Sequence, residues 1–233
     1  MLRILLLGLF VFAGCSKGAK KPIQKGEFTT TASETLEYYL YYPSNVKEEH
    51  PGLLLFLHGG GEAGAELKHL KISGPPSLME EKYPFPFLVL APQNPHAQKW
   101  WNVAAVHQLL EKVVEEHNID PFRIYLTGLS RGGYAAWEMA MNYPDTFAAT
   151  AIVSAMAPTP YAHWLDRSTP IWVFHGEEDA IMPVKEADEM VAKLQQLNFN
   201  VRYTRYPRTG HNAWDKAYTT DSLYIWMAQQ KRL

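Results

Sequence analysis

The chain has 233 residues, of which 47% are hydrophobic and 20% charged, and its formal net charge is -2. This length suits one α/β domain with a sizeable core and leaves little room for a second domain. The balanced charge excludes the strongly basic surface that nucleic-acid binding needs, so we expect no nucleic-acid partner. The single cysteine, Cys15, excludes a disulfide within the chain.

The first residues have the layout of a secretory signal. Residues 1–14 carry one early charge, Arg3, followed by an apolar run that is too short to span a bilayer. The run ends in Phe12-Ala-Gly-Cys15, which resembles a bacterial lipobox with Phe where Leu is commonest. A plain signal peptide or an uncleaved anchor is the alternative interpretation.

We therefore expect a signal peptide at residues 1–14, a lipidated Cys15 that begins a flexible basic tether over residues 15–26, and a folded domain over residues 27–233. The lipid would hold the protein at a bacterial cell envelope, at the outer membrane or in the periplasm where the cell has two membranes. It would be the domain's only contact with a membrane.

Strands and helices alternate along the predicted domain. Short apolar runs predict buried strands, and apolar residues at helical spacing predict helices. Strands are expected at residues 28–31, 36–42, 53–57, 87–91, 123–127, 148–154, 171–175 and 200–206, and helices at residues 103–117, 131–142, 185–197 and 215–230, the last as one helix or two. The first two strands form a hairpin and hence an antiparallel edge. The remainder predicts an α/β fold whose mostly parallel sheet has helices on both faces.

A possible nucleophile lies where a buried strand turns directly into a helix. Gly128-Leu-Ser-Arg-Gly132 has the G-x-S-x-G pattern, in which a strained turn exposes the serine hydroxyl at the carboxyl end of a sheet. Small residues are needed at both ends of the pattern because strand and helix approach closely there. An ordinary glycine-rich turn is the alternative, so the pattern alone does not define a site.

Two later segments supply the partners that such a serine needs. Asp179 follows the strand at 171–175, and His211 follows the last strand, so both are expected at the same sheet edge as Ser130. The order Ser, Asp, His is that of α/β-hydrolase catalytic triads. His211 would act as the base and Asp179 would orient its imidazole. Glu177 and Glu178 compete with Asp179, which is preferred because it matches the layout Gly-x-x-Asp-x-x-(Val/Ile)-Pro from Gly176 to Pro183, imperfectly because Met182 precedes the proline.

The developing oxyanion also needs backbone donors. One is the N–H of Arg131, the residue after the nucleophile, at the positive end of a helix. The second is expected from His58-Gly-Gly-Gly61, as the N–H of Gly59 or Gly60. His58 itself is expected to brace this loop.

These segments together resemble the α/β-hydrolase superfamily. Within it, the chain is similar to small bacterial lipoprotein esterases of the "predicted peptidase", phospholipase/carboxylesterase and polyhydroxybutyrate-depolymerase-like group, which are akin to feruloyl and acetyl-xylan esterases. The segments that carry the resemblance are residues 56–62, 91–93, 119–125, 128–133, 171–179 and 210–215. Arg131 departs from the Met or Gln that is commonest after the serine. The resemblance implies ester hydrolysis more clearly than it implies a substrate.

Other residues are given more modest roles. Trp100, Trp101 and Trp214 are candidate substrate-binding residues, although about half of such rings serve only for packing. His175 is expected to be a core residue. The remaining histidines lack metal-ligand spacing, so no metal and no other cofactor is expected. Residues 154–170 are too few for the helical lid of many lipases, which predicts an open site.

The sequence thus predicts a serine carboxylesterase-type hydrolase that forms an acyl-enzyme on small-molecule or polymer-attached esters, with short-acyl, carbohydrate-linked or aromatic acid esters favoured. A serine peptidase with the same triad is one alternative. A catalytically inactive binding lipoprotein with the same fold is the other. The sequence does not define the oligomeric state.

Overall fold

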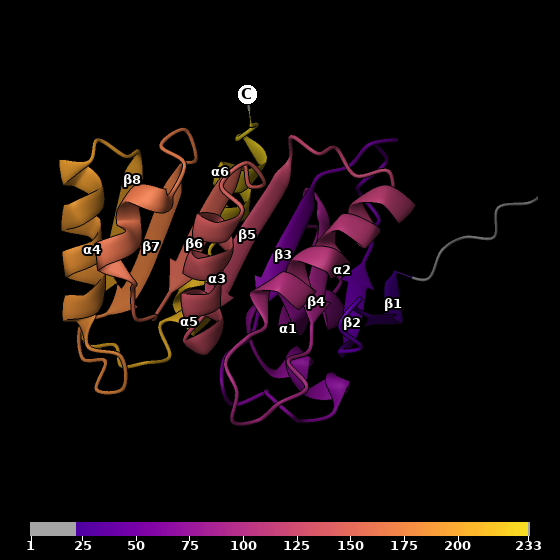
Figure 1. Cartoon of the computed structure of the whole chain (residues 1–233), viewed down its shortest axis with the longest axis horizontal. Helices are drawn as coiled ribbons and strands as arrows, with labels where there is room; N and C mark the ends of the chain where they lie inside the picture. Colours follow the sequence, from indigo (N-terminus) through magenta and orange to yellow (C-terminus); the bar gives the residue numbers. More distant parts are fainter. Residues whose placement is uncertain (1–21, 233) are drawn as a thin grey trace, which may run out of the picture.

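The computed structural model describes residues 22–232. The predicted signal peptide, Cys15 and the first part of the tether lie outside these residues. Within them, eight strands form one sheet in the order β1-β2-β4-β3-β5-β6-β7-β8. Figure 1 shows this sheet running across the molecule from β8 at one side to β1 at the other.

The predicted strands and helices are present, with ends that differ by a few residues. The strands are β1 (Ile23–Thr29), β2 (Thr35–Tyr41), β3 (Leu53–Leu57), β4 (Leu88–Pro92), β5 (Ile124–Leu129), β6 (Ala149–Val153), β7 (Ile171–Gly176) and β8 (Val201–Tyr206). The helices are α1 (Gly74–Glu80), α2 (Val103–Glu116), α3 (Arg131–Asn142), α4 (Val184–Gln196), α5 (Trp214–Ala217) and α6 (Asp221–Ala228). The C-terminal segment therefore forms two short helices.

The predicted tether is too long by four residues. Residues 23–26 belong to β1, where Ile23 lies opposite Tyr41 and Gly26 lies opposite Tyr38. These residues lack a clear alternation of apolar and polar side chains, because the strand lies at the edge of the sheet and most of its side chains are partly exposed. An edge strand of this kind gives a weak sequence signal.

The fold-class prediction is confirmed by the strand directions. β1 pairs with β2 and β2 with β4 in antiparallel fashion, whereas all other neighbours are parallel. The carboxyl ends of β3, β5, β6, β7 and β8 consequently meet at one edge of the sheet. This edge is where open α/β sheets bind ligands.

Two hydrophobic clusters fix the helices on the two faces of the sheet. In β3, Leu53, Leu55 and Leu57 face the cluster that contains the apolar sides of α2, α3 and α4. Leu54 and Phe56 face the other cluster, with residues of α1, α5 and α6. All five side chains are fully buried, which explains the continuous apolar run of this central strand.

Three elements were not predicted. They are α1 and two 3-10 helices, η1 (Leu67–Ile72) and η2 (Thr159–Trp164). η1 and α1 follow one another after the loop at β3, whereas η2 occupies part of the 154–170 interval. η2 is the longest helix in that interval, in agreement with the prediction that the interval is too short for a helical lid.

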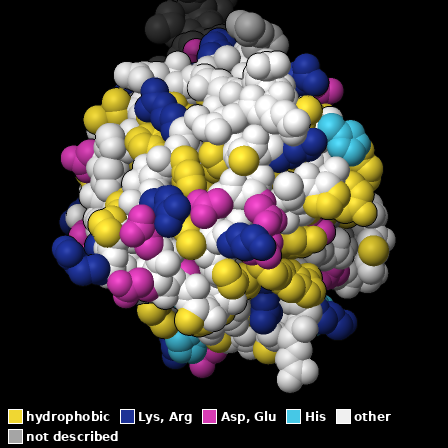
Figure 2. Space-filling model, turned by 90° about the vertical axis from the view of Figure 1, so that its left-hand side faces the viewer, with side chains coloured by type: hydrophobic (Ala, Val, Ile, Leu, Met, Phe, Trp, Pro, Cys, Tyr) yellow, Lys and Arg dark blue, Asp and Glu magenta, His cyan; other side chains and the backbone are white. Residues whose placement is uncertain are grey.

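The β8 edge of the sheet is covered by charge of both signs. Arg205 on β8 forms ion pairs with Glu177 and Asp188. Figure 2, which views the molecule from this side, shows acidic and basic side chains intermingled. Charged side chains on an edge strand oppose pairing with another sheet. In the part of the chain from 22 to 232, no helix has the length and apolar character needed to cross a membrane.

Candidate active site

Ser130 lies in the turn between β5 and α3. Its backbone has φ 52° and ψ -119°, a strained conformation for a residue with a side chain. Its N–H donates to the carbonyl oxygen of Val153 at 2.9 Å, which ties the turn to β6. A Cβ on Gly132 would lie 2.1 Å from the carbonyl oxygen of Leu57, so only glycine allows α3 to pass this close to β3.

His211 lies between Ser130 and Asp179. Its Nε2 is 2.8 Å from the Ser130 hydroxyl oxygen, and its Nδ1 is 2.7 Å from Oδ2 of Asp179. The three side chains come from the ends of β5, β7 and β8, and they form one hydrogen-bonded chain. With Nδ1 protonated and donating to the carboxylate, Nε2 is free to accept the serine proton.

Two backbone donors orient Asp179. Its Oδ1 accepts hydrogen bonds from the N–H groups of Ile181 and Met182, at 2.9 and 2.8 Å. The carboxylate is completely buried. The β7 and β8 loops are in close contact here, because a Cβ on Gly176 would lie 2.2 Å from the carbonyl oxygen of Gly210. Oδ2 is thereby left pointing at His211.

The two neighbouring glutamates lie outside this chain of contacts. Glu177 and Glu178 are both exposed, and the Glu177 carboxylate pairs with Arg205 at 3.3 Å. The geometry thus distinguishes Asp179 from its neighbours. The sequence could do so only through the spacing to Pro183.

His175 is buried as expected, but it also touches the Asp179 carboxylate. Its Nε2 lies 2.7 Å from the carbonyl oxygen of Met182 and 3.2 Å from Oδ2 of Asp179. A carbonyl oxygen can only accept, so Nε2 carries the proton. The sequence analysis did not predict this contact between His175 and the Asp179 carboxylate, and the i,i+4 spacing of the two residues was the only sign of it in the sequence.

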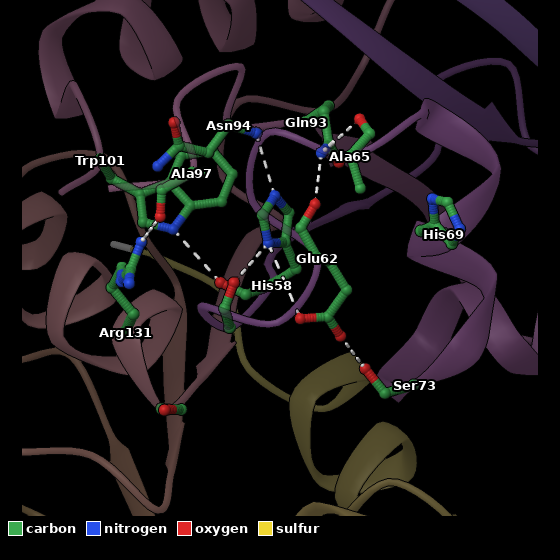
Figure 3. Close-up of polar contacts among 12 residues, drawn as sticks. His58, Glu62, Ala65, His69, Ser73, Gln93, Asn94, Ala97, Trp101 and Arg131 are labelled. Carbon is green, nitrogen blue, oxygen red and sulfur yellow. Dashed lines mark hydrogen bonds and ion pairs between the residues drawn. The ribbon is translucent and has the colours of Figure 1, made fainter. Parts of the chain in front are cut away.

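His58 joins the loop after β3 to Asn94 in the loop after β4 (Figure 3). Nδ1 of His58 donates to the carbonyl oxygen of Gly59 at 2.7 Å, and Nε2 accepts from the N–H of Asn94 at 2.9 Å. The ring is fully buried, and burial lowers the pKa of His58 to about 4. The imidazole is therefore neutral at physiological pH, which is the form that can both donate and accept. The predicted bracing role agrees with these contacts.

The candidate oxyanion-hole donors lie on both sides of the serine. Arg131 is the first residue of α3, and a Cβ on Gly59 would lie 3.5 Å from the Ser130 Cβ. A Cβ on Gly60 would lie 3.0 Å from the Arg131 guanidinium. The side chain of Arg131 meets no acidic neighbour among the described residues; its Nη1 instead donates to the carbonyl oxygens of Ala97 and Lys99.

A cavity of about 470 Å³ opens beside Ser130. Its walls include the loop after β3 and the loop after His211, with Glu62, Ser73, Asn212, Trp214 and Asp215 in the lining. The Trp214 ring lies edge-on to His211, with 5.1 Å between ring centres.

Of the three tryptophans expected near the substrate, only Trp214 lines this cavity. Trp101 is buried, packs on His58 and donates from Nε1 to the His58 carbonyl oxygen, so it supports the loop instead. Trp100 is half exposed and packs on Tyr134. It lines a separate hollow of about 660 Å³ together with residues 32–35, 95–96, 99 and 101–102. A pattern of tryptophans in sequence could not separate these three environments.

Within residues 22–232, no group of three or more His, Cys, Asp or Glu side chains is placed to hold a metal ion. A hydroxyl, an imidazole and a carboxylate in hydrogen-bonded order, beside a helix N-terminus and a glycine loop, constitute the geometry of a serine hydrolase with an α/β-hydrolase fold.

Comparison with known proteins agrees with this class. Residues 85–225, more than half of the chain, match the family described as Phospholipase/Carboxylesterase. The chain belongs to this family. The matched span includes Ser130, Asp179 and His211.

Several of the relatives are described as esterases. The probable acetylxylan esterase A of Aspergillus fumigatus is 27% identical over 148 residues, which are 57% of this chain and 38% of that protein. Feruloyl esterase B of Thermothelomyces thermophilus is 22% identical over 211 residues, 70% of each chain. The crystal structure of a thermostable esterase has a TM-score of 0.80 and 29% identity, and the match covers 91% of this chain and 64% of that one. This chain thus spans well under half of the acetylxylan esterase and just under two thirds of the thermostable esterase.

Proposed function

We propose that the protein hydrolyses carboxylic esters through an acyl-enzyme on Ser130. The observation that carries the proposal is the hydrogen-bonded chain from Ser130 through His211 to Asp179. Membership in the phospholipase/carboxylesterase family supports the same reaction class.

In the first half of the reaction, the Ser130 oxygen attacks the ester carbonyl carbon while its proton passes to Nε2 of His211. Asp179 stabilises the imidazolium that forms. The negative charge on the carbonyl oxygen is met by the N–H of Arg131 and by an N–H of Gly59 or Gly60. The tetrahedral intermediate then expels the alcohol, which takes the proton from His211.

In the second half, water replaces the alcohol. His211 takes a proton from the water as its oxygen attacks the acyl carbon, and it returns a proton to the Ser130 oxygen as the acid leaves. The site then has its starting protonation state. No group beyond the chain's own residues is required for this balance.

We favour short-acyl, carbohydrate-linked or aromatic acid esters as substrates. The absence of a long helix between residues 154 and 170 supports an open site, and the descriptions of the acetylxylan and feruloyl esterase relatives point to the same substrates. Comparing short-acyl, long-acyl, acetylated-sugar and feruloyl esters tests this preference. A strong preference for long-chain triglycerides would contradict it.

The reaction itself is tested by labelling with a fluorophosphonate, with Ser130→Ala as control. Labelling of the native protein and none of the variant is expected, together with a loss of about 10⁴–10⁶ in kcat for an ester. No labelling dependent on Ser130 would favour the inactive binding protein. Faster turnover of a peptide amide than of its matched ester would favour the peptidase.

We also propose the lipid anchor at Cys15, at a bacterial cell envelope. The support is the sequence alone, an apolar run that ends at this cysteine. Metabolic labelling with a fatty acid should mark the native protein in the membrane fraction. Cys15→Ser should abolish the label, and persistence of the label in the variant would refute the assignment.

A further inference from the structure

The cavity beside Ser130 contains a buried carboxylate that the hydrolytic steps do not use. Glu62 is only 8% exposed, yet it lines this cavity. Its Oε1 accepts a hydrogen bond from the Ser73 hydroxyl, and its backbone oxygen accepts one from Nε2 of Gln93 at 2.6 Å (Figure 3). The side chain is thus held in one place.

The second oxygen of this carboxylate lacks a donor among the described residues. The nearest basic nitrogen is Nδ1 of His58 at 4.0 Å, and the proton on that nitrogen is directed to the Gly59 carbonyl oxygen at 2.7 Å. Oε2 is not among the fully buried atoms without a partner in the described residues, so it is open to the cavity, where it can accept a hydrogen bond. Because Glu62 lines the cavity, a molecule bound there can supply that donor.

The carboxylate lies close to the reacting atoms. A Cβ on Gly59 would lie 3.4 Å from Oε2 of Glu62 and 3.5 Å from the Ser130 Cβ, so one small residue separates the two. A negative charge near a developing oxyanion opposes catalysis by Coulomb repulsion. A merely structural role, accepting from Ser73, could be filled by glutamine without that repulsion. The carboxylate has a second oxygen at the cavity, which can accept a hydrogen bond from a bound substrate.

The surroundings favour a neutral donor over a cation. The Arg131 guanidinium lies against Gly60, in the loop that carries Glu62, and its positive charge disfavours a second cation nearby. The Trp214 ring and the Ile72 side chain provide apolar surface across the cavity. Apolar surface beside a hydrogen-bond acceptor matches a polyol or sugar, which presents C–H groups and hydroxyls together.

We infer that Oε2 of Glu62 accepts a hydrogen bond from a hydroxyl group on the alcohol part of the ester, next to the ester oxygen. The alcohol side is indicated because the cavity is also lined by Asn212, Trp214 and Asp215, which follow the histidine that protonates the leaving alcohol. Glu62 thus selects esters of polyols or sugars over simple alkyl esters. This assignment rests on the proposed ester hydrolysis.

The test compares two acetates that differ in one hydroxyl group, ethane-1,2-diol monoacetate and n-propyl acetate. The native protein should prefer the hydroxylated ester by about tenfold in kcat/KM, the range of a hydrogen bond to a charged group. In Glu62→Gln, which keeps the shape and an acceptor for Ser73, this ratio should fall to about one. Glu189→Gln makes the same change at an exposed carboxylate on α4, outside the lining of the cavity, and should leave the ratio within about twofold.

Three outcomes overturn the inference. An unchanged ratio in Glu62→Gln, or an equal loss on both esters, makes the residue structural. A preference for choline acetate that depends on Glu62 makes the ligand a cation. Ethyl glycolate and ethyl propanoate differ by a hydroxyl group on the acyl part of the ester. If Glu62→Gln changes the preference only between these two esters, the recognised hydroxyl lies on the acyl side. Failure of the proposed function is distinct from all three, because Ser130→Ala would then hydrolyse both acetates as well as the native protein does.

Discussion

The two sides of Ser130 are held together in different ways. On the triad side (residues 128–133, 176–183 and 209–214), backbone packs directly on backbone at Gly132 and Gly176. On the loop side (residues 58–74 and 93–101), polar side chains such as His58, Gln93 and Trp101 bridge the two segments by hydrogen bonds. The structure of the triad side thus depends on glycines, which have no side chain. The structure of the loop side depends on side chains that form hydrogen bonds.

The largest expected effect is on the triad side, at Asp179. Asp179→Asn keeps the shape but removes the charge and favours the wrong imidazole tautomer, so we expect kcat to fall about 10⁴-fold. Steady-state hydrolysis of a short acetate measures it, with circular dichroism to show that the variant is folded. An Asn variant within tenfold of the native rate would mean that the carboxylate does not orient His211.

Gly132→Ala should have the next largest effect, because it breaks the backbone packing. The added methyl group would lie 2.1 Å from the Leu57 oxygen and 2.4 Å from the His58 oxygen. Neither is the flexible end of a side chain, so we expect a loss of more than about 4 kcal/mol in the free energy of unfolding, or no folded protein. Urea unfolding measures the loss. A loss below about 1 kcal/mol would contradict this packing.

On the loop side, His58 predicts a dependence of stability on pH. Burial lowers the pKa of His58 to about 4 in the folded state, whereas an unfolded histidine has its ordinary value near 6.5. Between these values the unfolded chain binds a proton that the folded chain does not. The free energy of unfolding therefore falls as the pH falls from 6.5 to 4, by about 3 kcal/mol from this residue alone.

Urea unfolding between pH 7 and pH 4 checks this dependence, with His58→Gln as the comparison. Other titrating groups affect both proteins, so only the difference between the two slopes belongs to His58. Above pH 6.5 the free energies of unfolding of the two proteins should differ by a constant amount. Equal slopes over the whole range would mean that the imidazole is not buried in its neutral form.

The smallest effect is expected at Gly61, one residue beyond the two candidate donors. A Cβ there would meet no atom within 4 Å. Gly61→Ala should therefore change the free energy of unfolding by less than about 0.5 kcal/mol. It is the matched control for Gly132→Ala. A large loss would show that the loop needs the conformational freedom of glycine.

The triad side could be predicted from sequence because each of its parts is local. A strand, a small-residue turn and a reactive side chain lie within ten residues of one another, and parallel strands bring their carboxyl ends to one edge. The same reasoning placed Ser130, Asp179 and His211 correctly relative to β5, β7 and β8.

The loop side could be predicted only in part. The contacts of His58 with Asn94 and of Glu62 with Ser73 join positions 36 and 11 residues apart, in irregular segments without periodicity. The same limit applies to Trp101, whose exposure depends on the loop that packs over it, and to β1, whose first residues were assigned to the tether. Pairing partners, rather than local residue type, decide these environments.

The backbone of Ser130 has a consequence for the evolution of the chain. At φ 52° and ψ -119° a glycine would be under less strain than any residue with a Cβ. Folding and reactivity thus place opposite demands on one position, and selection for stability alone would discard the nucleophile. A lineage that keeps a serine at this position therefore keeps it for its reactivity rather than for stability.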